Sequence, residues 1–281
     1  MSNKEMAKLF ADWNQGELES YLIEITAKIL DKDDDKGKEG QVVDYVLDKT
    51  GMKGTGRWTV QEAAEQSVAA PVIAASLDSR YLSGRKEERV AASKILQGPP
   101  TEAIPNVDKE QIVSDLQSAL YCAKVASYAQ GLGIIKAASD KNEWNVDLSL
   151  CASMWRGGCI IRAALLTKIT DALAKNKDLP NLLVDETFAE EVNARHMAWR
   201  RIVTLGIASG ISTPALSAGL NYYDQYRRER LPANLIQAQR DFFGGHTYER
   251  TDQKAGEFCH TLWDETHKDL GDISGRTAGE L

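Results

Sequence analysis

One long helix dominates what this sequence can fold into. Between Lys109 and Ser139, apolar residues recur at spacings of three and four, the repeat of one helix face. Many are small, which is typical of a helix with neighbours on several sides: Ile112, Leu116, Ala119, Leu120, Ala123, Ala126, Tyr128 and Ala129. The two glycines that follow, Gly131 and Gly133, favour close helix packing or a kink over a nucleotide site.

Almost every other segment also has helical spacing, and none reads convincingly as a strand. The predicted helices include residues 5–13, 17–30, 71–83, 187–209 and 235–243. We therefore predict an all-α fold, a large helical-bundle domain of about ten helices with an extended C-terminal arm. Residues 1–231 would form the helical domain, and residues 232–281 a C-terminal segment and arm. The clearest connector is the polar stretch 98–108, which begins Gly-Pro-Pro.

The composition narrows the function. With 281 residues and a net charge of −7, the chain can bury a sizeable core but does not suit a general nucleic-acid or membrane-surface binder. No apolar run is long enough to cross a bilayer, and the first residues lack a signal-peptide apolar region. The cysteines have no metal-ligand spacing, so we expect four free, mostly buried thiols and no metal site. These features favour the cytoplasm, with the plastid stroma as the alternative.

The stretch GMKGTGRWT, residues 51–59, is the first candidate ligand site. Three glycines let the backbone approach a ligand closely, while Lys53 offers a charge and Thr55 a hydroxyl. It matches neither a P-loop nor a dinucleotide fingerprint, and a plain glycine-rich turn is the alternative. We expect Trp58 in the core, and Thr59 to cap a helix with Glu62 as a capping box.

The stretch LPANLIQAQRDFFGGH, residues 231–246, is the second candidate. Asn234 can cap a short helix that ends at two glycines, because glycine takes the left-handed conformation readily. Arg240 on its last turns and His246 just after it would suit a phosphate or a carboxylate. Isolated arginines and histidines are more often solvated or structural, so spacing alone favours that plainer reading.

Six stretches together closely resemble the helical domain of 6-phosphogluconate dehydrogenase, in the family's order and across nearly the whole chain. They are DWNQGELESYLIEIT, GMKGTGRWT, RYLSGRKEERVAASK, ALYCAKVASYAQG, MWRGGCIIR and LPANLIQAQRDFFGGHTYE. Details such as TGMKGTGRW are most similar to the plant and algal members of this family. The resemblance implies an enzyme of the oxidative pentose phosphate pathway that oxidises 6-phosphogluconate with NADP and decarboxylates it to ribulose 5-phosphate.

The resemblance also implies roles for particular residues. Lys53 and Thr55 fall on the family's KGT motif at the substrate site, and Arg80 on its phosphate-binding arginine. Arg240 and His246 match the pair that reaches into the partner subunit's site, which implies a homodimer with the polar tail as its arm. By spacing alone, Arg80 is an ordinary cation at a helix end.

The departures from the family are equally informative. The family's NADP-binding Rossmann domain, its glycine-rich substrate loop and its helix with the catalytic lysine and glutamate have no counterpart here, so no catalytic or cofactor-binding residue is assigned. We expect the chain alone to be inactive and, without that first long helix, to expose an apolar groove. It is either part of a longer dehydrogenase or a non-catalytic dimerisation module that pairs with full-length subunits. An unrelated helical scaffold would require six chance matches.

Overall fold

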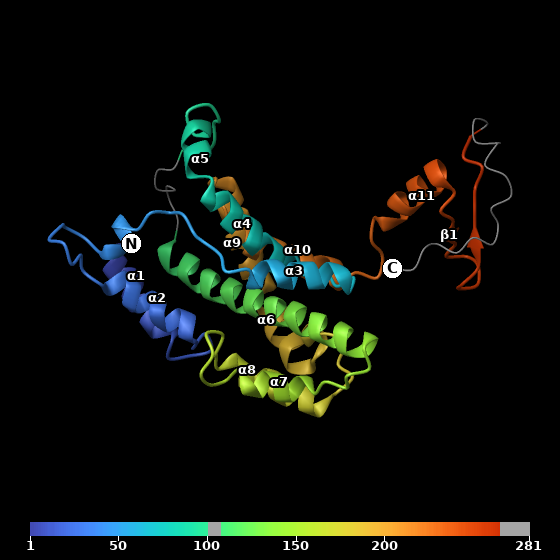
Figure 1. Ribbon diagram of the computed structural model, residues 1–281, viewed down its shortest axis with the longest axis horizontal. Helices are drawn as coiled ribbons and strands as arrows, with labels where there is room; N and C mark the ends of the chain where they lie inside the picture. The colour runs from blue at the N-terminus through green and yellow to red at the C-terminus, as the bar shows by residue number, and fades with distance from the viewer. Residues whose placement is uncertain (101–107, 265–281) are drawn as a thin grey trace. The chain divides into compact units, whose positions relative to one another are not determined.

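The computed structural model describes residues 1–100 and 108–264 (Figure 1). These residues form eleven α-helices, two short 3-10 helices and one pair of two-residue strands, which confirms the predicted all-α fold. The helices are α1 (Asn3–Trp13), α2 (Tyr21–Asp31), α3 (Thr55–Glu65), α4 (Pro71–Gly84), α5 (Lys86–Ala92), α6 (Lys109–Lys141), α7 (Leu148–Met154), α8 (Leu165–Lys175), α9 (Glu186–Ala208), α10 (Pro214–Tyr226) and α11 (Ala233–Gly244). The 3-10 helices are η1 (Val42–Tyr45) and η2 (Leu182–Val184), and the strands are β1 (Tyr248–Glu249) and β2 (Phe258–Cys259).

The chain divides into two compact units, Met1–Tyr223 and Asp224–Leu281, called here the N-terminal and C-terminal units. The predicted functional boundary between residues 231 and 232 stays a prediction. The predicted connector at residues 101–107, and residues 265–281 of the predicted arm, lie outside the described residues.

Helix α6 is the centre of the N-terminal unit, as its pattern of small residues predicts. Asp108 caps it by accepting hydrogen bonds from the backbone N–H groups of Glu110 and Gln111 at 3.0 and 3.1 Å. Its small buried residues allow α9 to pack closely along it. Arg201 on α9 donates two hydrogen bonds of 2.6 Å to the buried carboxylate of Asp115 on α6. This bidentate ion pair also holds α9 against α6.

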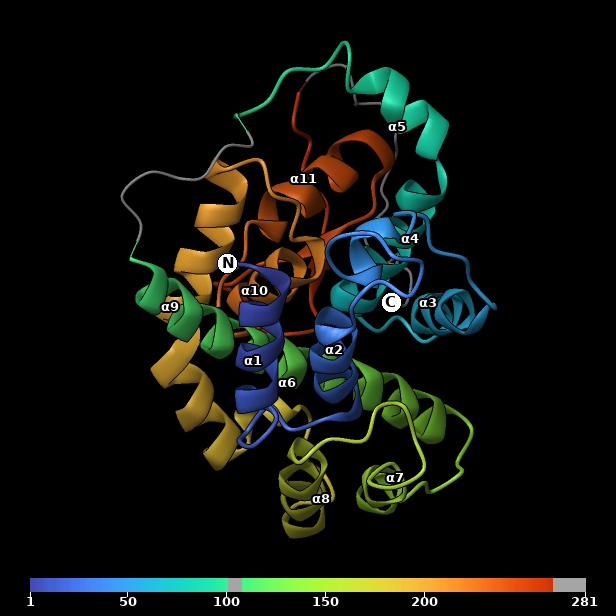
Figure 2. The same ribbon diagram turned by 90° about the vertical axis from the view of Figure 1, so that its left-hand side faces the viewer.

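Besides α9, the helices α4 and α7 and the 3-10 helix η2 contact α6, whereas α5 lies away from it (Figure 1). Helices α1 and α2 lie side by side (Figure 2), and α7 packs against α8. Helix α10 crosses α9 where a Cβ atom on Gly219 would stand 2.9 Å from the ring of Trp199. That indole is fully buried and donates to the Leu216 carbonyl at 3.1 Å, so a side chain at 219 would force the two helices apart.

Several local predictions were wrong. Helix α3 begins at Thr55 rather than after Thr59, because Gly54 takes the left-handed conformation (φ +104°) and starts the helix earlier. Trp58 is 58% exposed rather than part of the core. Helix α11 begins at Ala233, so Asn234 is inside it and is not its cap.

The cysteines and the β structure also differ in part from expectation. All four cysteines are free, as predicted, but only Cys122 is fully buried, and its burial raises the pKa of that thiol to about 12. Strands β1 and β2, which the sequence did not indicate, form an antiparallel pair in the C-terminal unit. Among the described residues, no helix combines the length and apolar character that a bilayer crossing requires.

Candidate functional site

The turn that leads into α3 holds two of the predicted site residues. Gly54 is buried and its left-handed conformation favours glycine, while a Cβ atom there would lie 3.1 Å from the Trp58 ring. The turn places Thr55 at the first position of α3, where the backbone N–H groups carry partial positive charge. Lys53 is exposed just before it, and within the described residues its ammonium has no hydrogen-bond or ion-pair partner.

Arg80 lies beside this turn although it is far from it in sequence. Its Nη2 donates to the Gly51 carbonyl, and Ser83, one turn further along α4, accepts a 3.1 Å bond from the Thr50 N–H. Gly56 on α3 would contact Leu77 on α4 through a Cβ atom at 3.5 Å, so the two helices pack closely at this end. The structure thus brings Lys53, Thr55 and Arg80 together as one exposed cationic corner of the N-terminal unit.

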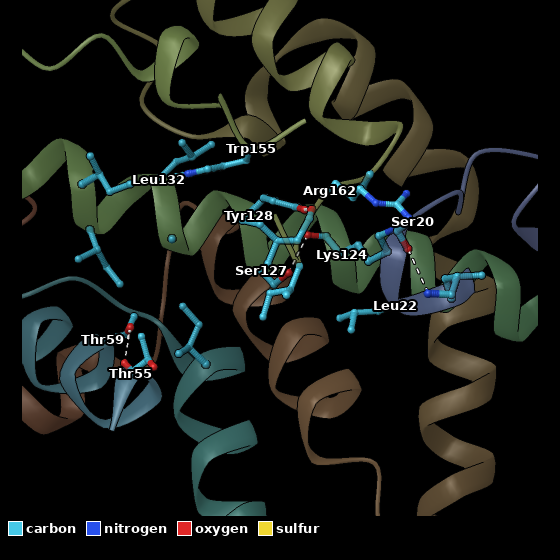
Figure 3. Close-up of a pocket in the computed structure, with 18 of the residues that line it drawn as sticks. Ser20, Leu22, Thr55, Thr59, Lys124, Ser127, Tyr128, Leu132, Trp155 and Arg162 are labelled. Atoms are coloured by element: carbon cyan, nitrogen blue, oxygen red, sulfur yellow. Dashed lines mark hydrogen bonds between the residues drawn. The ribbon is translucent and has the colours of Figure 1, made fainter. Parts of the chain in front are cut away.

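An apolar groove of about 1010 Å³ extends from this corner (Figure 3). Its walls come from α2, α3, α4, α6 and the loop between α7 and α8, and Thr55 and Trp58 line it from the side of the turn. Its other lining residues include Leu22, Ile73, Leu120, Leu132, Ile134, Trp155 and Ile160. At its far end Arg162 pairs with Glu24 on α2, which fits the predicted use of this arginine in charge pairing.

One ammonium group faces this apolar groove. Lys124 on α6 is half-buried, and its Nζ donates one long hydrogen bond, 3.4 Å, to the Leu18 carbonyl. Loss of hydration lowers the pKa of Lys124 from 10.5 to about 8, and the nearby carboxylate of Glu17 opposes this only in part. Within the described residues Lys124 forms no ion pair, so its charge is costly here.

The other two predicted site residues lie in the C-terminal unit. Helix α11 is capped at its C-terminal end by Gly245, which is left-handed (φ +59°) as predicted. Arg240 donates to the Gln237 side chain at 2.9 Å, and Gln237 in turn donates to the Thr247 carbonyl at 2.6 Å. One glutamine therefore joins the arginine to the turn that carries the exposed imidazole of His246.

The imidazole of His246 lies against Gly244. A Cβ atom on Gly244 would lie 2.7 Å from the His246 Nε2, so the imidazole rests directly over the bare backbone of Gly244. The ring also meets Phe243 edge-on, with 6.0 Å between ring centroids. The structure thus places Arg240 and His246 around one helix end. This pair belongs to a different unit of the chain from the corner formed by Lys53, Thr55 and Arg80.

Sequence reasoning missed the groups that support these residues. Gln237 and Asp241 share α11 with Arg240, and Asp241 is a fully buried carboxylate. An acidic residue followed by two phenylalanines at the end of a helix is the signal that could have pointed to it. In the described part of the chain, no cluster of three histidine, cysteine or carboxylate side chains is arranged to hold a metal ion.

Comparisons with known proteins agree on one family. A family model described as "6-phosphogluconate dehydrogenase, C-terminal domain" matches residues 1–263. The "6-phosphogluconate dehydrogenase, decarboxylating 1" of Oryza sativa subsp. japonica is 58% identical over 263 residues, which cover 94% of this chain and 54% of the rice protein. The decarboxylating enzyme of Lactococcus lactis is 47% identical over a similar share.

A solved structure gives the same result. The chain matches a 6-phosphogluconate dehydrogenase of Plasmodium falciparum, described in its apo form and with its cofactor NADP+ or its substrate 6-phosphogluconate. The TM-score is 0.89 at 42% identity, over 94% of this chain and 56% of the other. This chain spans about half the length of the relatives that it matches. On this similarity of sequence and fold, the chain belongs to the 6-phosphogluconate dehydrogenase family.

Proposed function

We propose that this chain supplies the substrate-binding and dimerisation part of an NADP-dependent oxidative decarboxylase of the oxidative pentose phosphate pathway. The reaction is the conversion of 6-phosphogluconate to ribulose 5-phosphate. The observation that carries the proposal is the cationic corner, where Arg80 lies beside the Lys53–Thr55 turn in a chain of this family. The chain as a whole carries a net charge of −7, which repels an anion. An anionic sugar acid therefore needs a local cluster of cations in order to bind.

The chemistry of the corner fits a phosphorylated sugar acid. The guanidinium of Arg80 offers a planar set of donors for the phosphate oxygens. Lys53 adds a compact charge, and the Thr55 hydroxyl can exchange hydrogen bonds with a sugar hydroxyl. Arg240 and His246 would complete the site of a partner subunit. This assignment explains why two anion-binding groups lie together in the C-terminal unit.

The exposed apolar side chains of that unit support dimerisation. Leu235, Ile236 and Phe243 on α11 are all more than half exposed, and no hydrophobic side chain of the described residues 224–264 is buried. Covering such an apolar helix surface with another surface lowers the free energy, so an exposed patch of this kind is typical of an interaction site. The same observation favours the second candidate function, a non-catalytic module that pairs with full-length subunits.

The described residues do not fit NADP. A Rossmann-type site needs parallel strands and a glycine-rich turn, whereas the strands of residues 1–100 and 108–264 are one antiparallel pair of two residues each. We therefore assign the cofactor to the part of the relatives' length that this chain does not span. We further propose that an apolar helix from the same part covers the groove of the N-terminal unit.

Substrate binding is tested by calorimetric titration of the protein, at its native length, with 6-phosphogluconate. Arg80→Ala is expected to weaken binding at least about tenfold, since one charged, two-pronged contact is lost. Arg85→Ala removes an exposed arginine at the end of the same helix and serves as the control. Equal affinities for the two variants would contradict the proposal, provided that circular dichroism shows both to be folded.

Catalysis and assembly are tested separately. The 281-residue chain incubated with 6-phosphogluconate and NADP is expected to form no NADPH above a heat-killed control, because residues 1–100 and 108–264 offer no Rossmann-type site to hold the nicotinamide against the substrate. Native mass spectrometry of a mixture with a full-length plant enzyme is expected to show a hybrid dimer. Its absence would count against the module. We propose that the protein is located in the cytoplasm. The plastid stroma is the alternative location, because some relatives carry chloroplastic names.

A further inference from the structure

The interior of the C-terminal unit is polar. Its described residues, 224–264, bury no hydrophobic side chain, while Asp241 and Thr247 are completely buried. A buried carboxylate is costly unless every part of it is paired. The hydrogen-bond donors around Asp241 are therefore the contacts that hold this unit together.

Four donors converge on Asp241. Its Oδ1 accepts hydrogen bonds from the Thr247 backbone N–H at 3.0 Å and from the His260 imidazole at 2.8 Å. Its Oδ2 accepts from the Thr261 backbone N–H at 3.1 Å and the Trp263 indole at 2.8 Å. Burial by itself would raise the pKa of Asp241, but the donors at His260, Thr261 and Trp263 lower it below its usual range. The group is an ionised hub that joins α11, the turn after it and the segment after β2.

His246 is fixed from both sides by this residue. On one side, the Gly245 N–H donates to the Asp241 backbone carbonyl at 2.9 Å. On the other, the Thr247 N–H donates to the Asp241 carboxylate, and the Thr247 carbonyl accepts from Gln237. Thr247 is left-handed (φ +56°), a conformation that is unfavourable for threonine and persists only where its surroundings hold it.

We propose that Asp241 is a positioning residue for substrate binding, because it holds the turn on which His246 is presented. The proposal rests on the function proposed above for His246. Asp241 touches no substrate itself. It sets the direction of the imidazole, and Gln237 ties the same turn to Arg240. Loss of the Asp241 charge would leave the donors of His260, Thr261 and Trp263 without their ionised acceptor, and the turn would lose its fixed shape.

A double-mutant cycle tests this role. Affinity for 6-phosphogluconate is measured for the protein at its native length with Asp241→Asn, His246→Ala and both changes. Asp241→Asn is expected to weaken binding about tenfold alone but less than about twofold when His246 is already alanine, since coupled residues are not additive. Asp252→Asn, which neutralises an exposed carboxylate paired with Arg250 in the same unit, is the matched control and should leave affinity unchanged. Equal losses in both backgrounds, or no loss, would overturn the proposal.

Nuclear magnetic resonance separates this inference from the proposed function. The chain has four histidines, so the His246 imidazole signals can be assigned by comparison with His246→Ala. In Asp241→Asn, these signals are expected to move toward those of a free imidazole, and the Thr247 amide to exchange at least about tenfold faster. If the wild-type protein does not bind 6-phosphogluconate, the proposed function fails. The positioning of His246 is then judged by these signals, and an unchanged His246 spectrum would refute it.

Discussion

Replacing Lys124 with methionine is expected to stabilise the N-terminal unit at neutral pH. The change keeps most of the side chain's length and apolar contacts while removing a charge that faces an apolar groove. It gives up only the 3.4 Å hydrogen bond to the Leu18 carbonyl, which is long for such a bond. Most buried substitutions destabilise a protein, so a gain would be distinctive.

The magnitude follows from the depressed pKa. A fall from 10.5 to about 8 corresponds to about 3 kcal/mol, because each pH unit represents about 1.4 kcal/mol. Below pH 8, Lys124 is charged in both the folded and unfolded states, so the wild-type fold carries the full penalty. Between pH 8 and 10.5 only the unfolded state keeps the proton, so wild-type stability rises with pH. Above pH 10.5 the penalty is gone. Because the groove admits water, we expect a gain of about 1–3 kcal/mol at pH 7.

Urea unfolding followed by circular dichroism measures this difference directly. The free energies of unfolding of wild type and Lys124→Met are compared at pH 7, 9 and 10.5, with the slope against urea checked to be the same. Lys8→Met, an exposed lysine on α1, is the control and should change stability by less than about 0.5 kcal/mol. A less stable Lys124→Met at pH 7, or a difference that stays constant up to pH 10.5, would refute the reasoning.

Three further predictions follow from backbone geometry and chain length. Gly54→Ala should destabilise the start of α3 by roughly 1–2 kcal/mol because the residue is left-handed, whereas Gly51→Ala, which points into open space, should be neutral in the same thermal melt. Gly219→Ala should lower the free energy of unfolding by about 1–3 kcal/mol, because the new methyl group would press on the buried ring of Trp199. Gly131→Ala on α6, where the methyl group has room, should leave stability unchanged or raise it, and the reverse order would contradict the packing described. An immunoblot of the source tissue with an antibody against the glycine-rich turn should show a band larger than 31 kDa by a nucleotide-binding domain; a band at 31 kDa would favour the dimerisation module.

The sequence predicted the helical fold well because helical spacing is a strong local signal. The expected limits of the central helix, 109–139, and of the helix at 187–209 lie within two residues of α6 and α9. The start of α3 was predicted wrongly because two local signals competed. Thr59 and Glu62 have the spacing of a capping box, but a left-handed Gly54 begins the helix more than one turn earlier.

The candidate site was only partly predictable, for a different reason. Lys53 and Arg80 are 27 positions apart, and only the packing of α3 on α4 brings their segments together. The hub at Asp241 depends on donors from residues 247 to 263, whose convergence no local pattern indicates. The family resemblance supplied the site residues, whereas the residues that support them could be identified only from the three-dimensional structure. The roles of Lys53, Thr55, Arg80, Arg240 and His246 stay predictions.

The hydrogen bond from Arg80 to the Gly51 carbonyl has a consequence for the energetics of recognition. A free arginine side chain loses about 2 kcal/mol of rotamer entropy when it is immobilised, and a ligand that immobilises it must offset that loss. Here part of that ordering accompanies folding, so less of it remains to be lost when an anion arrives. The guanidinium has five N–H donors and uses one of them on the carbonyl, so the others stay available at a preset angle. A lysine at this position would keep the charge but not this preorganisation.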